Sequence, residues 1–144
     1  MSNADRLISI LGEMFGGDEV EVDAMTIDRM IGALEPVAAE DIVCLMAGTD
    51  DNSVATSEGL DGLRGVWADW LGVFARVRFE IESVENVGDN VVVIARQIGT
   101  TRHDGVEIAQ PSAAVWKFGD GIIEQVEFHL DRSKAMKSAR QQGP

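Results

Sequence analysis

The sequence predicts an α+β fold, in which helices pack on one face of a curved antiparallel sheet. In the first half of the chain, apolar residues recur every three or four positions, which is typical of amphipathic helices. In the second half, a Gly-Asp-Gly turn at residues 119–121 separates two runs rich in Val, Ile, Trp and Phe, as in a β-hairpin. A chain of 144 residues, 45% of them hydrophobic, suffices for a single domain over residues 1–144.

Two short helices are predicted near the N-terminus. One apolar stripe spans residues 7–15, with Asp5 as its expected cap, and a second spans residues 27–34. The acidic residues 18–23 are expected to connect these helices. The apolar run at residues 42–46 is expected to form a strand.

The strongest helical pattern covers residues 63–74. Its spacing places Trp67, Trp70 and Phe74 on one side, so this helix must cover a large apolar surface. Aromatic residues of a packed core and of a pocket wall look alike in sequence. Both interpretations therefore stay open at this point.

The strands follow this helix. Residues 77–82 alternate between apolar and polar types, and the rhythm breaks near Ser83, which predicts a bulge. After a turn at residues 88–90, residues 91–95 are apolar at every position, so both faces of that strand should be covered. Helices can cover one face. A second subunit is the economical cover for the other, which predicts a homodimer through the outer sheet face.

A further polar turn is expected at residues 101–105, before the hairpin that is centred on residues 119–121. After the last strand, residues 134–139 show a weak pattern of a C-terminal helix.

Charge and composition exclude several classes of protein. A net charge of -13, from 25 acidic and 12 basic residues, argues against nucleic acid and anionic membranes as partners. No signal peptide or long apolar run is visible, so a cytoplasmic location is expected. The only cysteine, Cys44, lies among apolar residues and is expected to be buried and inert. His103 and His129 belong to no metal-ligand motif, and no phosphate-binding loop is present, so neither a metal nor a cofactor is expected.

Several segments carry a resemblance to a known family. They are Gly-Leu-Asp-Gly-Leu-Arg at 59–64 leading into Trp-Ala-Asp-Trp-Leu at 67–71, Gly-Asp-Asn-Val-Val-Val at 88–93, Val-Trp-Lys-Phe-Gly-Asp-Gly at 115–121, and Phe-His-Leu-Asp-Arg at 128–132. In this order they resemble the SnoaL-like branch of the nuclear transport factor 2-like superfamily, which also holds ketosteroid isomerases and limonene epoxide hydrolase. The resemblance covers roughly residues 40–139. It implies a cone of bent antiparallel sheet (a cystatin-like roll) around an apolar pocket, usually in a dimer, but it does not fix a function.

The resemblance also allows catalytic positions to be compared. The places that hold acids and bases in limonene epoxide hydrolase correspond here to Ala95, Gln97 and Phe128, and the acidic position of the isomerases corresponds to Ala114. None of these side chains can transfer a proton, so neither activity is expected. Polyketide cyclases carry an acid/base aspartate at the end of the last strand, and Asp131 matches that place.

Asp131 has two interpretations. Its carboxylate could move a proton next to a carbonyl group, with His129 or Arg96 adjusting its charge, or it could simply cap the helix that follows. His129 alternates with Phe128 and Leu130, so it is expected to face outward, toward the possible dimer contact. Arg96 is expected on the same outer face, near a partner's carboxylate.

Strand alternation also predicts the lining of the pocket. If Phe128 faces inward, matching positions of the neighbouring strands share its face, and the helix at 63–74 lies above them. The predicted ligand-binding residues are Trp67, Trp70, Gln97, Gln110, Ser112, Trp116, Val126, Phe128 and Leu130. Such a lining suits an uncharged hydrophobic molecule that carries carbonyl or hydroxyl groups. Three functions stay open: a ligand-binding protein, a small enzyme of the polyketide cyclase, isomerase or dehydratase kind using Asp131 and His129, and a protein-association module.

Overall fold

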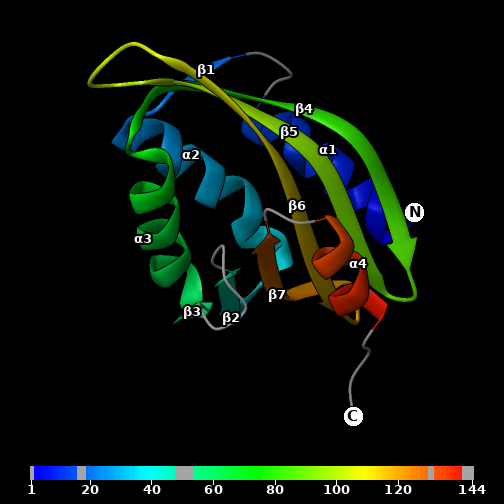
Figure 1. Cartoon of the computed structure of the whole chain (residues 1–144). Helices are drawn as coiled ribbons and strands as arrows, with labels where there is room; N and C mark the ends of the chain where they lie inside the picture. Colours follow the sequence, from blue (N-terminus) through cyan, green and yellow to red (C-terminus); the bar gives the residue numbers. More distant parts are fainter. Residues whose placement is uncertain (1, 16–18, 48–53, 130–131, 141–144) are drawn as a thin grey trace.

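The computed structural model describes residues 2–15, 19–47, 54–129 and 132–140. Its helices are α1 (Asn3–Phe15), α2 (Ala24–Leu34), the short 3₁₀ helix η1 (Glu35–Val37), α3 (Gly59–Leu71) and α4 (Arg132–Arg140). Its strands are β1 (Val20–Glu21), β2 (Ala38–Ala47), β3 (Val54–Glu58), β4 (Phe74–Val87), β5 (Asn90–Thr101), β6 (Glu107–Gly119) and β7 (Ile122–His129). The strands form one strongly curved sheet, with α1, α2 and α3 inside the curve (Figure 1).

The sheet has the strand order β1-β4-β5-β6-β7-β2-β3. All neighbouring strands are antiparallel except β2 and β7, which run parallel. The predicted class, helices with a curved antiparallel-rich sheet, is therefore confirmed. The strand predicted at residues 42–46 is confirmed as part of β2, which lies beside β7, the last strand of the chain.

The N-terminal elements differ from the sequence prediction at their ends. The backbone N–H of Asp5 donates to Ser2 Oγ (3.1 Å), and the N–H of Ser2 donates to Asp5 Oδ2 (3.3 Å), so Ser2 takes the capping position expected of Asp5. The connector predicted at residues 18–23 contains β1, which pairs with the edge of β4. Strand β3 was not predicted, and residues 48–53 before it lie outside the described residues.

The predicted bulge and the predicted hairpin turn are both confirmed. The pairing of β4 with β5 shifts register between Ile81 and Ser83, which is the predicted bulge. At the β6–β7 hairpin, Asp120 has φ 53° and Gly121 has φ 80°, as a two-residue turn that follows the strand twist requires. Before the bulge, Ile81 lies opposite Ala95. After it, Ser83 lies opposite Ile94, so the pairing of β4 with β5 is shifted by one residue.

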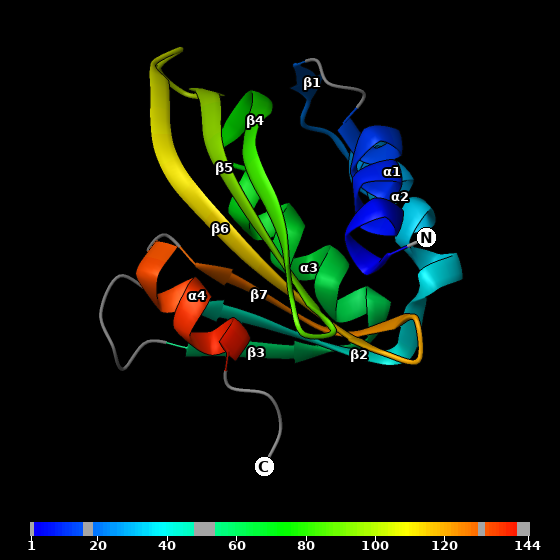
Figure 2. The ribbon, with the colours of Figure 1, turned by 90° about the vertical axis from the view of Figure 1, so that its right-hand side faces the viewer.

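The outer face of the sheet is covered in part by α4, which packs outside β5 and β6 (Figure 2). Val92 and Ile94 contact a small apolar cluster that includes Ala135 and Ala139 of this helix, and neither is more than 5% exposed. The cover that the apolar run at residues 91–95 requires is therefore supplied within the chain. The homodimer stays a prediction, but this run is not an argument for it.

The inside of the curve holds the main core. Leu63, Trp67 and Leu71 of α3 are at most 2% exposed and face the sheet, as the spacing in the sequence predicted. Phe74 was wrongly included in this helix, since α3 ends at Leu71 and Phe74 begins β4. Helix α3 thus forms a wall opposite the sheet, and the candidate site lies between the two.

No helix in the described part of the chain has the length and apolar composition needed to span a membrane.

Candidate functional site

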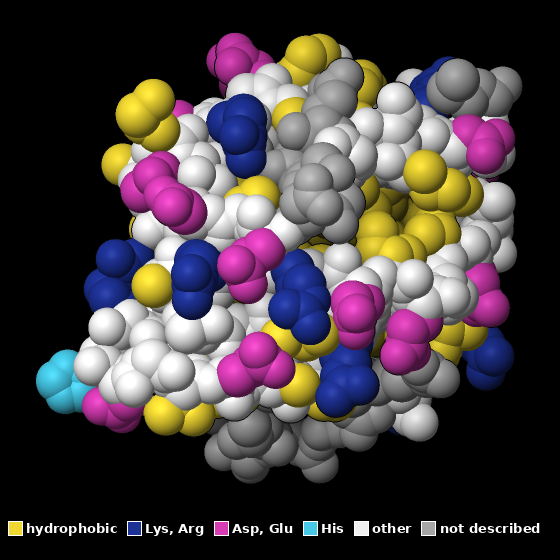
Figure 3. Space-filling model, turned by 90° about the horizontal axis from the view of Figure 1, so that it is seen from above, with side chains coloured by type: hydrophobic (Ala, Val, Ile, Leu, Met, Phe, Trp, Pro, Cys, Tyr) yellow, Lys and Arg dark blue, Asp and Glu magenta, His cyan; other side chains and the backbone are white. Residues whose placement is uncertain are grey.

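A cavity of about 50 Å³, called here the inner cavity, lies between α3 and the concave face of the sheet. Its walls are apolar apart from Ser112, and they include Trp67, Trp70, Phe79, Ala114, Trp116 and Phe128. Ile81 also lines it and is 47% exposed. On the face seen from above, a hollow with hydrophobic walls is visible (Figure 3). A volume of this size admits a few water molecules or part of a small guest.

Aromatic packing keeps this space from closing. The ring of Phe128 lies 5.4 Å from that of Trp70, 6.2 Å from that of Trp116 and 6.3 Å from that of Trp67, measured between centroids. The contacts to Trp67 and Trp116 are edge-to-face, a geometry that aromatic pairs favour. Rigid rings in this arrangement cannot fill every gap between helix and sheet, which leaves an aromatic hollow.

A second cavity of about 230 Å³, called here the mouth cavity, adjoins the first. The two share Trp70, Ser112 and Phe128 in their walls, so they lie next to each other. The mouth cavity differs in being partly polar, because Gln110 and His129 join Ser112 in its wall. A guest could therefore place an apolar body among the rings and a polar group near these side chains.

Polar atoms without partners lie on the concave side of the sheet. Both amide atoms of Gln97, which is 1% exposed, lack a hydrogen-bond partner among the described residues, and so does Nε1 of Trp116. Leaving such a group unsatisfied costs about 1–3 kcal/mol. Hydrogen-bonding capacity is thus present in the interior and is not used by the described part of the chain.

A buried carboxylate lies on the outer face of β7, under α4. Glu127 of β7 is 5% exposed, and its Oε1 lies 3.0 Å from Nε2 of His129. The Ser138 hydroxyl of α4 donates to the same oxygen at 2.5 Å. The other oxygen, Oε2, accepts hydrogen bonds from Gln125 (2.8 Å) and lies 2.9 Å from Nζ of Lys117. Glu127 therefore joins β6, β7 and α4 in one polar cluster.

The charge of Glu127 follows from these contacts. Burial raises the pKa of this carboxyl, but hydrogen bonds from His129, Ser138 and Lys117, together with the charge of Lys117, outweigh burial and lower the pKa to about 2. The carboxyl is therefore ionised at neutral pH and can only accept hydrogen bonds.

The structure brings together most of the residues predicted from the sequence. Trp67, Trp70, Ser112, Trp116 and Phe128 line the inner cavity, and Gln110 and His129 join Trp70, Ser112 and Phe128 at the mouth cavity. Gln97 is buried on the concave side, and Val126 is fully buried in the core. Leu130 and Asp131 lie outside the described residues.

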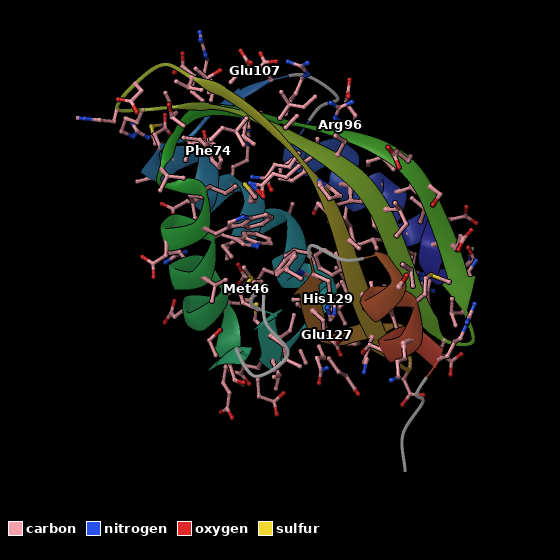
Figure 4. The ribbon with its side chains drawn as sticks, in the orientation of Figure 1. Met46, Phe74, Arg96, Glu107, Glu127 and His129 are labelled. Atoms are coloured by element: carbon pink, nitrogen blue, oxygen red, sulfur yellow. The ribbon has the colours of Figure 1, made fainter. Side chains whose placement is uncertain are left out.

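His129 and Arg96 do not share a site. His129 is turned toward Glu127, and its side chain is 12% exposed. Arg96 lines a separate groove on the outer face of the sheet, and Figure 4 shows it well apart from His129. Asp131, whose charge either side chain was expected to adjust, lies outside the described residues, so that prediction is not tested.

The sequence interpretation missed Glu127. Its signal is the alternation of Gln125, Glu127 and His129, which puts three polar side chains on one face of β7. That pattern does not reveal that α4 covers this face and buries the carboxylate. Among the described residues, no group of three His, Cys, Asp or Glu side chains could hold a metal ion. Cys44 is 1% exposed, and burial raises its pKa to about 11, as expected of an inert thiol.

Proteins of known structure share this fold. A proposed SnoaL-like polyketide cyclase from Jannaschia sp. CCS1 is 18% identical, with a TM-score of 0.69 over 98% of this chain and 93% of its own. A proposed isomerase from Bacillus subtilis is 15% identical, with a TM-score of 0.66 over 96% and 95% of the two chains. The protein TerC, co-crystallised with polyporic acid, is 18% identical, with a TM-score of 0.63 over 94% and 99%. At these identities the likeness shows the fold alone.

The sequence itself carries the family assignment. No curated protein sequence matches this chain. A family model, however, matches residues 14–126, which is most of the chain, and it describes the SnoaL-like domain. This match agrees with the curved sheet, the helical wall and the aromatic hollow described above. The chain therefore belongs to the SnoaL-like domain family.

Proposed function

We propose that the protein binds a small hydrophobic molecule carrying a carbonyl or hydroxyl group, in the hollow between α3 and the sheet. One observation carries this proposal: the apolar inner cavity adjoins, at Trp70, Ser112 and Phe128, a mouth cavity that Gln110 and His129 also line. Apolar walls supply affinity, and a few polar groups at one end fix the orientation of a guest.

Two proteins of the same fold support this proposal. TerC was crystallised with polyporic acid, and a protein with a ketosteroid isomerase-like fold from Catenulispora acidiphila was crystallised with trimethylamine. Relatives of this fold thus accept small molecules of different polarity. The inner cavity holds only about 50 Å³, so we expect part of a guest to enter it while the rest lies in the mouth cavity.

The test is a titration with anisole, followed by tryptophan fluorescence, because Trp67, Trp70 and Trp116 all line the inner cavity. Ala114→Leu adds three carbons to the wall of that cavity and is expected to abolish binding. Ala68→Leu makes the same change on the exposed side of α3 and should bind like the wild type. At a concentration 100 times the Kd, anisole should stabilise the wild type by about 2.7 kcal/mol. Equal binding by both variants would contradict the proposed site.

A second candidate is an enzyme that transfers a proton next to a carbonyl group. The observation that favours it is the contact of His129, a residue in the wall of the mouth cavity, with the buried carboxylate of Glu127. In this proposal Asp131, two residues beyond His129, is the acid/base group, as the family resemblance suggests.

Deuterium exchange tests this candidate. An enzyme of this kind should exchange the α-hydrogens of acetophenone with deuterium from the solvent, which mass spectrometry measures. Asp131→Asn is expected to abolish exchange while anisole still binds. If the wild type binds acetophenone without exchange above the buffer rate, the protein is a binding protein and not this enzyme.

We also propose a homodimer through the outer sheet face. Beside α4 this face has a groove of about 320 Å³, with Arg96, Ala109 and Pro111 in its wall. Arg96 suits an acidic partner, and a chain with a net charge of -13 offers acidic surface. Light scattering should give twice the mass of the chain, and Ala109→Asp should halve it. If the wild type is monomeric at two concentrations that differ 100-fold, this proposal is wrong.

A further inference from the structure

The two cavities differ in size and in polarity, and together they restrict the shape of a guest. The inner cavity has a volume of about 50 Å³, and the mouth cavity has a volume of about 230 Å³. A cavity of about 150 Å³ between apolar side chains binds benzene, so a ring fits the mouth cavity and not the inner one. Gln110 and His129 are in the wall of the mouth cavity and not in that of the inner cavity. The ring and the polar group of a guest therefore belong in the mouth cavity.

The inner cavity is left for a slimmer part of the same guest. Its wall is apolar apart from Ser112, so a polar group that entered it would lose hydrogen bonds to water. Its volume is about a third of that which holds benzene, and the rings around it pack rigidly. Such a space admits an unbranched alkyl chain, but neither a branched chain nor a second ring.

One residue of the inner wall is suited to limit the length of such a chain. Met30 of α2 is 2% exposed and lies on the buried face of that helix, with Ile27 and Leu34. It lines the inner cavity but not the mouth cavity, so it lies away from the part of the wall that the two cavities share. Among the described residues of the inner wall, Met30 alone has an unbranched side chain with three torsions. Its length and conformation therefore decide how far the inner cavity extends toward α2.

We propose that the ligand is a ring compound with an unbranched apolar tail, and that Met30 sets the greatest length of that tail. The ring and its hydroxyl or carbonyl group occupy the mouth cavity. The tail enters the inner cavity beside Trp70 and Phe128, which line both cavities, and ends against Met30. This inference rests on the proposed function and names the class of ligand.

The first test uses the wild type and follows three methionines by NMR, in protein labelled with ¹³C at the methionine methyl groups. Met46 lines the mouth cavity, Met30 lines the inner cavity, and Met25 of α2 is 82% exposed. Phenol should shift the methyl resonance of Met46, and 4-butylphenol should shift those of Met46 and Met30. Neither compound should shift that of Met25. A Met30 resonance that stays in place while 4-butylphenol shifts that of Met46 would overturn the inference.

The second test measures affinity along a series of 4-alkylphenols, from phenol to 4-octylphenol. Each methylene that enters the inner cavity should tighten binding about fourfold, until the tail reaches Met30 and the gain stops. Met30→Ala removes three heavy atoms from the wall, so the gain should continue for about two or three further carbons. 4-tert-Butylphenol, whose tail is branched, should bind the wild type about tenfold more weakly than its isomer 4-butylphenol.

Met25→Ala is the matched control, because it makes the same substitution at an exposed position of α2 and should leave the limiting tail length unchanged. The same limit in a folded Met30→Ala variant as in the wild type would overturn the role of Met30. If circular dichroism shows that Met30→Ala does not fold, Met30→Leu replaces it. Leu has as many heavy atoms as Met but a shorter reach, so the limit should then move by about one carbon.

The outcomes separate this inference from the proposed function. If phenol binds and longer tails bring no gain in affinity, the tail assignment is wrong, while the mouth cavity still binds a ring. If no compound of the series binds, the proposed function fails, and the ligand assignment fails with it.

Discussion

The buried carboxyl of Glu127 makes the folding stability of the protein depend on pH. Hydrogen bonds hold its pKa at about 2 in the folded protein, below the ordinary value of 4.5 that it regains on unfolding. Between these two values the unfolded chain binds more protons than the folded one, so stability rises with pH. The contribution of Glu127 is therefore complete above about pH 4.5 and is lost as the pH falls through 2.

Glu127→Gln removes this contribution. We expect the variant to be less stable than the wild type by roughly 3 kcal/mol at pH 7, because a shift of about 2.5 pKa units corresponds to that free energy. The difference should shrink toward zero as the pH approaches 2. Urea unfolding of both proteins between pH 2 and pH 8 measures it, with Glu124→Gln as the control. A difference that is the same at pH 3 and pH 7 would contradict the assigned pKa.

For single residues, the sequence predicts which face of the sheet a side chain lies on better than it predicts which groups that side chain contacts. Period-two alternation correctly placed Phe128 and Trp116 on the concave side of the sheet and Arg96 on the other. It did not identify Glu127 as a buried group, because burial of the outer face depends on where α4 packs. That position is set by contacts distant in sequence, which a local pattern does not contain.

At the scale of elements, α4 replaces the second subunit that the sequence suggested as a cover. The helix presents two small residues, Ala135 and Ala139, one turn apart, and both are fully buried against the sheet. Small side chains let a helix approach closely, and Asn90 of β5 donates from Nδ2 to the Ala139 carbonyl at 3.2 Å. The short helix is therefore attached to the sheet by apolar contact and by hydrogen bonds.

Ala135→Asp tests this packing. A carboxylate placed in that apolar cluster would lose its hydration without gaining a partner, so we expect the protein to lose roughly 3 kcal/mol or to release α4. Lys137→Asp, on the exposed side of the same helix, should cost less than about 1 kcal/mol. Urea unfolding and hydrogen exchange of α4 measure both variants. Equal stabilities would show that α4 does not cover the sheet in solution.

The elements themselves were largely predictable. Strong periodicity identified α1, α2, α3 and β4, and the glycine turn identified the β6–β7 hairpin. The parallel pairing of β2 with β7 was not predictable, because alternation marks a strand without naming its neighbour. Strand β3 was missed since Val-Ala-Thr-Ser-Glu offers only two apolar residues to a pattern search.

At the scale of the molecule, the curved sheet and α3 leave an aromatic hollow with polar residues at one end. The fold and its family were accessible from the sequence through the order of several weak motifs. The volume of the hollow was not, because it depends on how Trp67, Trp70 and Trp116 pack around Phe128. Aromatic residues that fill a core and those that wall a cavity give the same sequence pattern.

The most direct measurement is a crystal structure of the protein soaked with iodobenzene, whose iodine is located by anomalous scattering. The account predicts an iodine peak between α3 and the concave face of the sheet, in contact with Trp70 and Phe128, and no such peak in Ala114→Leu. Iodine found only on the outer surface of the wild type, with the space between the rings unchanged, would contradict a binding site in the hollow.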